Sequence, residues 1–257
     1  MKTLFKTSFL TSIIVTVLYV VLLYPFVLIE ILNLYDLVLV SLSILPGFLI
    51  MSVIYNLDEQ NKEPLWLLSI AFILGAVNLH LDINILDYLL ISKDVPSNFL
   101  STGIEALTVS ATEESLKFIV VMLIFYPNKY FDEPFDGIVY AVFVGMGFAT
   151  AENLTFVLQG SASLAIMRMI SAVPAHFVFA VIMGYYLGKA KSSKKSQLIF
   201  ILLAILIPII FHALYDYFLF IDFIPGVWFG GIVTLIIALF IAKNSIQKHM
   251  SASPFKN

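Results

Sequence analysis

Residues 111–126 read ATEESLKFIVVMLIFY and place Glu113, Glu114 and Lys117 at the head of an uninterrupted apolar run. A run of this kind is typical of a helix in a membrane, where each unpaired charge near the bilayer centre costs about 2.5 to 3.5 kcal/mol on insertion scales. Three charges at such a place need a structural partner or a chemical role. The rest of the chain indicates which of the two applies.

The composition is that of an integral membrane protein. Hydrophobic residues make up 61% and charged residues 12% of the 257 residues, and the mean hydropathy is +1.01. The apolar segments are near-continuous runs of about 20 residues, which predicts α-helices rather than the short alternating strands of a barrel. The net charge of -3 gives no indication of a nucleic-acid partner. The lack of cysteine excludes disulfides, thiolate nucleophiles and cysteine-bound metals.

The apolar runs predict an all-α, polytopic membrane helix bundle of about eight transmembrane helices, which forms a single domain over residues 1–257. His80, Asp82 and Asp87 lie in the second half of the third run, so residues 65–79 alternatively form that span alone. Residues 80–100 would then follow the outer surface. The predicted spans are 8–29, 35–55, 65–90, 103–126, 137–158, 166–188, 198–220 and 226–242.

The lysine and arginine distribution predicts the orientation. Eleven of the 14 basic residues fall on the side of the membrane that holds the N-terminus, whereas only Lys93 and Arg168 fall in the opposite loops. Because positive charge is retained on the inner side, both termini are expected in the cytoplasm.

Four of the predicted spans carry acids or histidines at a similar depth. A rise of 1.5 Å per residue places Glu113, His176 and His212 about 12 to 15 Å below the outer ends of their spans, and Glu152 about 9 Å below. Scattered structural residues would not be expected to share one layer. The coincidence therefore predicts one site in the outer half of the membrane.

Local spacing adds detail to this site. Lys117 is four residues after Glu113 and three after Glu114, so it can pair with either carboxylate while the other faces elsewhere. Asp216 follows His212 by four residues and can accept a ring N–H from it, which fixes the tautomer.

Each of these residues also has a purely structural interpretation. The glutamates and Lys117 can form an ion pair that only lowers the cost of insertion, and His212 with Asp216 can be a structural pair. His176 follows Pro174 and can bond a carbonyl that the proline frees. Asn153 can be an interhelical hydrogen-bonding group.

Taken together, these groups suit the activation of water. A buried glutamate can take a proton from water and deliver one to a leaving amine, while the histidines and Asn153 stabilise an oxyanion. Alternatively, His176, His212 and Glu152 bind a divalent metal such as Zn²⁺. The sequence leaves both alternatives open.

Five blocks occur in an order that resembles the PrsW family of intramembrane proteases, distant relatives of the CAAX prenyl proteases in the broader CPBP group. The resemblance covers approximately residues 63–219. The blocks are EPLWLLSIAFILGA (63–76), TEESLKFIVV (112–121), FDEPFDGIVYAVFVGMGFATAENLTF (131–156), RMISAVPAHFVFAVIMGYYLG (168–188) and FHALYDYF (211–218).

The resemblance implies a protease of the bacterial cell membrane with its catalytic core at about 63–219. It implies a regulatory cut, on the outer side, in a membrane-anchored anti-sigma factor, and hence a single-span membrane protein as the substrate. By motif, it assigns the site to Glu113, Glu114, Glu152, Asn153, His176, His212 and Asp216.

Two other functions use the same residues. A proton- or ion-coupled carrier could relay protons through intramembrane acids and histidines, although the chain lacks the matched half-repeats of many carriers. A non-catalytic relative could hold a transmembrane partner.

Small residues predict where helices approach closely. Gly137, Gly145 and Gly147 remove bulk from the fifth span. Gly184 and Gly188 form a GxxxG spacing whose default interpretation is helix packing, with a homo-oligomer as the alternative.

Overall fold

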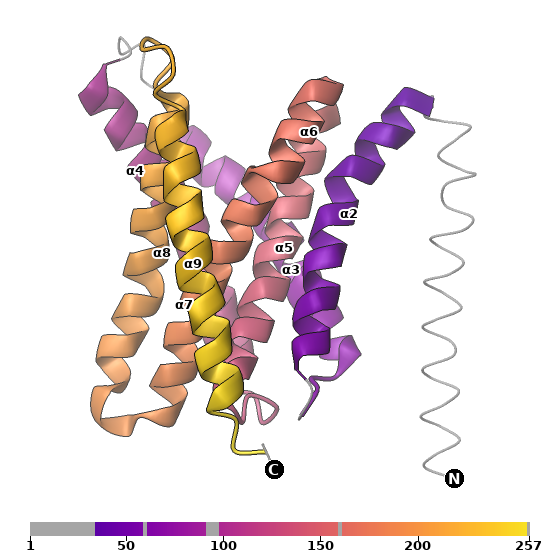
Figure 1. Cartoon of the computed structure of the whole chain (residues 1–257), viewed down its shortest axis with the longest axis vertical. Helices are drawn as coiled ribbons and strands as arrows, with labels where there is room; N and C mark the ends of the chain where they lie inside the picture. Colours follow the sequence, from indigo (N-terminus) through magenta and orange to yellow (C-terminus); the bar gives the residue numbers. More distant parts are fainter. Residues whose placement is uncertain (1–33, 59–60, 91–97, 159–160, 256–257) are drawn as a thin grey trace.

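The computed structural model describes residues 34–58, 61–90, 98–158 and 161–255, and within these ranges the chain is helical, with no β-strand (Figure 1). Lys194–Ser196 forms a 3₁₀ turn before α8. The α-helices are α2 (Leu34–Leu57), α3 (Leu65–Leu90), α4 (Phe99–Val120), α5 (Pro134–Leu158), α6 (Ala162–Ile170), α7 (Ala172–Ser192), α8 (Gln197–Phe220) and α9 (Phe229–Ser251), and a π-helical turn, Val121–Phe125, extends α4.

Six helical segments of the described chain are long and apolar enough to cross a membrane: 34–57, 65–89, 134–157, 162–192, 194–220 and 229–251. They match six of the predicted spans. The predicted span 8–29 lies outside the described residues, and α4, which carries the charges quoted above, is a helix but is not among the six. The count of eight and the cytoplasmic location of both ends therefore remain predictions.

The third helix does not end at residue 79, because α3 continues to Leu90, and residues 65–89 are long and apolar enough to cross a membrane, which favours the longer of the two predicted spans. Its polar residues explain the continuity, since Asn78 and Asp82 are buried against the bundle. The Asn78 side-chain amide donates to the carbonyl of Leu116 on α4 at 3.1 Å.

Two predicted boundaries also differ from the structure. The last helix extends to Ser251 rather than residue 242, because Ala242, Ser245 and His249 continue its buried face at helical spacing. The sixth span is broken at Ser171 into α6 and α7. Pro174 then falls in the first turn of α7, where its missing N–H has no partner to lose.

Helix α5 occupies the centre of the bundle, and its glycines set how closely its neighbours approach (Figure 1). A Cβ on Gly147 would lie 2.0 Å from the carbonyl oxygen of Phe72 on α3, and one on Gly184 of α7 would lie 2.2 Å from that of Gly137. The predicted close approach is confirmed. Gly184 packs on α5 of the same chain, in agreement with the default interpretation of the GxxxG spacing.

The start of α5 is fixed by a group of buried acids. Asp136 accepts the backbone N–H groups of Asp132 and Glu133, each at 2.8 Å, and the hydroxyl of Tyr140 donates to Glu63 just before α3. Burial of the Glu63 carboxyl raises its pKa to about 7, and the nearby charges of Asp58 and Asp132 act in the same direction.

Glu63 makes the stability of the fold depend on pH. The folded-state pKa of Glu63 lies above its ordinary value of 4.5. The contribution of Glu63 to the stability of the fold is therefore complete below pH 4.5 and is lost as the pH rises through about 7. We expect the protein in detergent to unfold several degrees lower at about pH 8.5 than at about pH 6. The part of this decrease in unfolding temperature that comes from Glu63 should be absent in Glu63→Gln. The variant Glu105→Gln, at an exposed position of α4, should show the full decrease. An unchanged pH dependence in Glu63→Gln would contradict the assignment.

Candidate active site

Helix α4 supplies two carboxylates and a lysine to the interior of the bundle. The ammonium of Lys117 lies 3.1 Å from Glu113 Oε2 and 2.8 Å from Glu114 Oε1, and all three side chains are buried. The prediction that the lysine pairs with one glutamate while the other faces elsewhere is wrong. The long lysine side chain, one turn further along, ends between the two carboxylates and contacts both.

Helix α7 places His176 against this group. Its Nδ1 atom lies 3.1 Å from the Lys117 ammonium, and its Nε2 atom lies 2.7 Å from Glu152 Oε2 on α5. Because an ammonium can only donate, Nδ1 is the acceptor and the Nε2–H donates to Glu152. Both ring nitrogens thus engage side chains of the site rather than a carbonyl freed by Pro174.

Helix α8 brings His212 to the other side of the carboxylates. Its Nδ1 atom lies 3.0 Å from Glu114 Oε1, and its Nε2 atom lies 3.2 Å from Asp216 Oδ2. The predicted contact between His212 and Asp216 one turn apart is confirmed. The ring stacks on Phe179 of α7 with 4.8 Å between ring centroids, which limits its rotation.

Short helix α6 adds a residue that the sequence analysis assigned only to an outer loop. Arg168 Nη2 lies 2.9 Å from Glu152 Oε1, and its Nε–H donates to Asn153 Oδ1 at 2.7 Å. The available signal was that Arg168 is the only arginine of the chain and lies within an apolar segment. The Asn153 side-chain nitrogen is buried without a hydrogen-bond partner among the described residues.

Asp82 on α3 is a second residue that sequence reasoning missed. Its side chain is buried, and its Oδ1 atom has no hydrogen-bond partner in the described part of the chain. It lies near enough to Lys117 and Glu152 for their charges to interact. A charged residue within an apolar run could have indicated that Asp82 belongs to the site. The same position was also compatible with a segment on the outer surface.

These contacts connect all the predicted site residues, which come from α4, α5, α7 and α8. One ligand atom each from Glu113, Glu114, His176 and His212 lies within 4.8 Å of the others, and all four residues are buried. Two carboxylates and two imidazoles are a donor set that suits a divalent metal such as Zn²⁺. The Lys117 ammonium, a cation, already lies among three of these groups. Glu152, a predicted ligand, is not in this group of four and instead contacts His176.

A membrane helix bundle that gathers acids and imidazoles in its interior has the side chains that a membrane-embedded hydrolase needs. The profile of the PrsW family intramembrane metalloproteases matches residues 63–243, so the chain belongs to the PrsW family. It is thus a protease and a multi-pass protein of the bacterial membrane.

Relatives from three bacteria agree with this assignment. Protease PrsW of Bacillus subtilis (strain 168) is 35% identical over 187 residues, which cover 70% of this chain and 82% of the relative. Protease PrsW of Geobacillus kaustophilus (strain HTA426) is 36% identical over 182 residues, covering 70% and 79%. Protease PrsW of Clostridioides difficile (strain 630) is 33% identical over 219 residues, covering 82% and 91%. No solved structure matches the chain significantly.

Arg168 is expected to act by positioning Glu152. Arg168→Gln removes the charge that holds Glu152 against His176, and we expect the cleavage rate to fall about tenfold. Arg168→Lys should recover part of this loss, because lysine restores the positive charge but lacks the planar guanidinium group that can contact Glu152 and Asn153 at the same time. The measurement is the rate of substrate cleavage at equal protein level. Equal rates for Arg168→Gln and the unaltered protein would show that the contact has no positioning role.

Proposed function

We propose that this chain is an intramembrane endopeptidase that cleaves a single-span membrane protein, an anti-sigma factor, with a glutamate-activated water molecule. The observation that carries the proposal is the buried group of Glu113, Glu114, His176 and His212, whose ligand atoms lie within 4.8 Å of one another. Such a group can deprotonate water and stabilise negative charge in the same place. No comparable observation favours the carrier or the non-catalytic partner.

Glu114 is assigned as the general base. Its Oε1 atom is held by Lys117 at 2.8 Å and faces His212 Nδ1 at 3.0 Å. Its Oε2 atom is buried and has no hydrogen-bond partner among the described residues, so it is the oxygen free to accept a proton from water. Lys117 keeps the carboxylate charged, and the proton can later pass to the amine that leaves.

Glu113, His176 and His212 are assigned as the residues that would hold a divalent metal. When bound, such a metal supplies Lewis-acid chemistry that polarises a carbonyl and makes water more acidic. Glu152 accepts the Nε2–H of His176, which leaves Nδ1 as the ring nitrogen with a lone pair, and that lone pair accepts from the Lys117 ammonium in this structure. Asp216 holds His212 in the same way from its Nε2 side. Carboxylates that orient ligating histidines are typical of metal sites.

Asn153 is assigned to the oxyanion. Its buried side-chain nitrogen lacks a hydrogen-bond partner in the described structure, while its oxygen is fixed by Arg168 at 2.7 Å. A fixed amide donor of this kind can stabilise the negative oxygen of a tetrahedral intermediate.

The outer location of the cut follows from the predicted orientation. His212 precedes the end of α8 at Phe220 by eight residues, or about 12 Å, and that end is predicted to face outward. A single-span substrate would be cleaved near its outer end, as the resemblance to the family implies.

The metal assignment is tested with purified protein and a tagged single-span anti-sigma factor from the same organism. We expect a chelator to lower cleavage at least tenfold and added Zn²⁺ to restore it. Elemental analysis should find metal bound to the unaltered chain and lost from His212→Ala. Full cleavage by metal-free protein would reject the metal and leave a glutamate mechanism. If the protein never cleaves a single-span anti-sigma factor, the proposed substrate class is rejected.

A further inference from the structure

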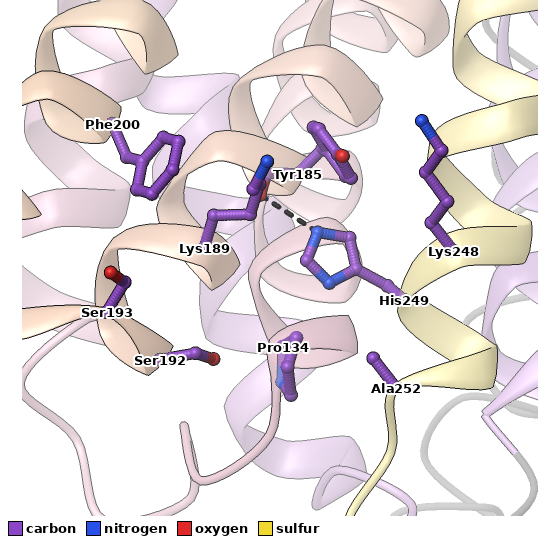
Figure 2. A pocket seen from close by; sticks show the side chains of 9 residues that line it. All are labelled: Pro134, Tyr185, Lys189, Ser192, Ser193, Phe200, Lys248, His249 and Ala252. Carbon is purple, nitrogen blue, oxygen red and sulfur yellow. Dashed lines mark hydrogen bonds between the residues drawn. The ribbon is translucent and has the colours of Figure 1, made fainter. Parts of the chain in front are cut away.

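Two adjoining cavities open at the lysine-rich end of the bundle. The first, of about 350 Å³, opens between the ends of α7, α8 and α9. Figure 2 shows Lys189 and Lys248 on either side of it, with His249 between them. The second, of about 430 Å³, continues along α8 and α9 and shares Tyr185, Lys189 and Lys248 with the first. The two cavities therefore form one groove, which we call the α7–α9 groove.

The mouth of this groove carries two positive charges without acidic partners. Within the described residues, no carboxylate lies within ion-pair distance of Lys189 or Lys248. The Lys189 ammonium lies 4.7 Å from the centroid of the Phe200 ring at the edge of the cavity. Lys191, by contrast, donates to the carbonyl of Tyr126 at 2.6 Å. The lysines of the groove are thus available to an external anion.

The floor of the mouth is held in place by His249. Its Nε2–H donates to the carbonyl of Tyr185 at 2.9 Å, and the two rings meet edge to face (Figure 2). Ser192 and Ser193 also line the mouth and offer hydroxyl donors. His249 therefore fixes the floor of the mouth by its contacts with Tyr185.

The groove combines charged and apolar side chains, and most of the exposed lining of its mouth is apolar. Its second part is lined by Ile207 and Phe211 of α8 and by Ile241 of α9, together with the polar side chains of Asn244 and Ser245. An ion alone would make no use of the apolar side chains. A molecule with an anionic head and a hydrocarbon tail would satisfy both parts, because apolar burial favours the tail and the lysines favour the head.

We propose that the α7–α9 groove binds an anionic phospholipid, with its phosphate between Lys189 and Lys248 and one acyl chain along α8 and α9. Basic pockets between transmembrane helices bind anionic lipid head groups in this manner. The head-group end of the site is distinct from the catalytic group, since Lys189 lies 13 residues, or about 20 Å, along α7 from His176, whereas the second part of the groove reaches Phe211, the neighbour of His212.

Native mass spectrometry of the full chain in detergent tests the proposal, with phosphatidylglycerol, phosphatidylcholine and inorganic phosphate as probes. We expect one phosphatidylglycerol to be retained more strongly than phosphatidylcholine. The double variant Lys189→Gln/Lys248→Gln should weaken this retention about tenfold. The matched control Lys194→Gln/Lys195→Gln removes the same charge from the neighbouring turn and should retain the lipid. Inorganic phosphate at equal concentration should not displace it.

A second variant tests the apolar part separately. Asn244 is exposed and lines the groove, so Asn244→Trp fills the groove without a change of charge or of the core. We expect it to lower phosphatidylglycerol retention as well. Equal retention of the two lipids, or equal loss in both lysine double variants, would overturn the proposal. Displacement by inorganic phosphate would instead assign the lysines to a free phosphate.

Discussion

Replacing Glu114 by Gln is expected to lower substrate cleavage by about 10² to 10⁴-fold, because the amide cannot accept a proton from water. The substitution preserves size, and the remaining oxygen can still accept from Lys117. Membrane insertion and protein level should therefore be unchanged. The measurement is the rate at which a tagged substrate is converted to its fragment, normalised to the amount of enzyme in the membrane.

The same loss is expected for Glu113→Gln, His176→Ala and His212→Ala, whose side chains belong to the same buried group. Glu105→Gln is the matched control, since Glu105 lies on the same helix but is exposed, and it should cleave at the normal rate. Retained cleavage in all four site variants would reject the site. Loss in Glu113→Gln alone among the glutamates would move the base from Glu114 to Glu113.

Replacing Gly184 by Ala is expected to lower stability by about 3 kcal/mol, or a Tm lower by about 10 °C. The added methyl would lie 2.2 Å from the carbonyl oxygen of Gly137, and the atoms it meets are backbone, so the helices must separate. Separation of α7 from α5 also moves His176 away from Glu152. Cleavage should therefore fall together with stability, as measured by thermal unfolding in detergent and by the substrate assay.

Gly103→Ala is the matched control for this prediction. A methyl group there would lie 3.5 Å from the ring of Tyr217, an ordinary contact distance, so both stability and cleavage should be retained. If Gly184→Ala unfolds at the same temperature as the unaltered protein, then α5 and α7 are not in the close contact that the structure gives them.

The helices were predictable where an apolar run decides them, and less so at their ends. The predicted span 65–90 coincides with α3 because its hydrocarbon content is continuous. The end of α9 was placed too early because its last turns are polar on one side, and their buried residues, such as His249, which donates to Tyr185 on α7, are visible only in the packed structure. The break at Ser171 has no strong sequence signal other than the nearby Pro174.

The membership of the site was predictable, but its internal contacts were not. Spacing along a helix indicates the depth of a residue, and shared depth identified His176 and His212. Rotation of one helix against another is set by packing, so the sequence did not predict that Lys117 contacts both glutamates. Arg168 was missed for the same reason, because its contact with Glu152 depends on how α6 folds back over α5.

The central position of α5 has a consequence for how the family can vary. In the most apolar part of α5, 89% of the residues are buried inside the protein. The corresponding share for α8 is 22%. Exchanges among leucine, isoleucine, valine and phenylalanine on the outer face of α8 leave its lipid contacts equivalent, so drift there is nearly neutral. On α5 each exchange must fit a fixed neighbour, and divergence between homologues should be slowest along this helix.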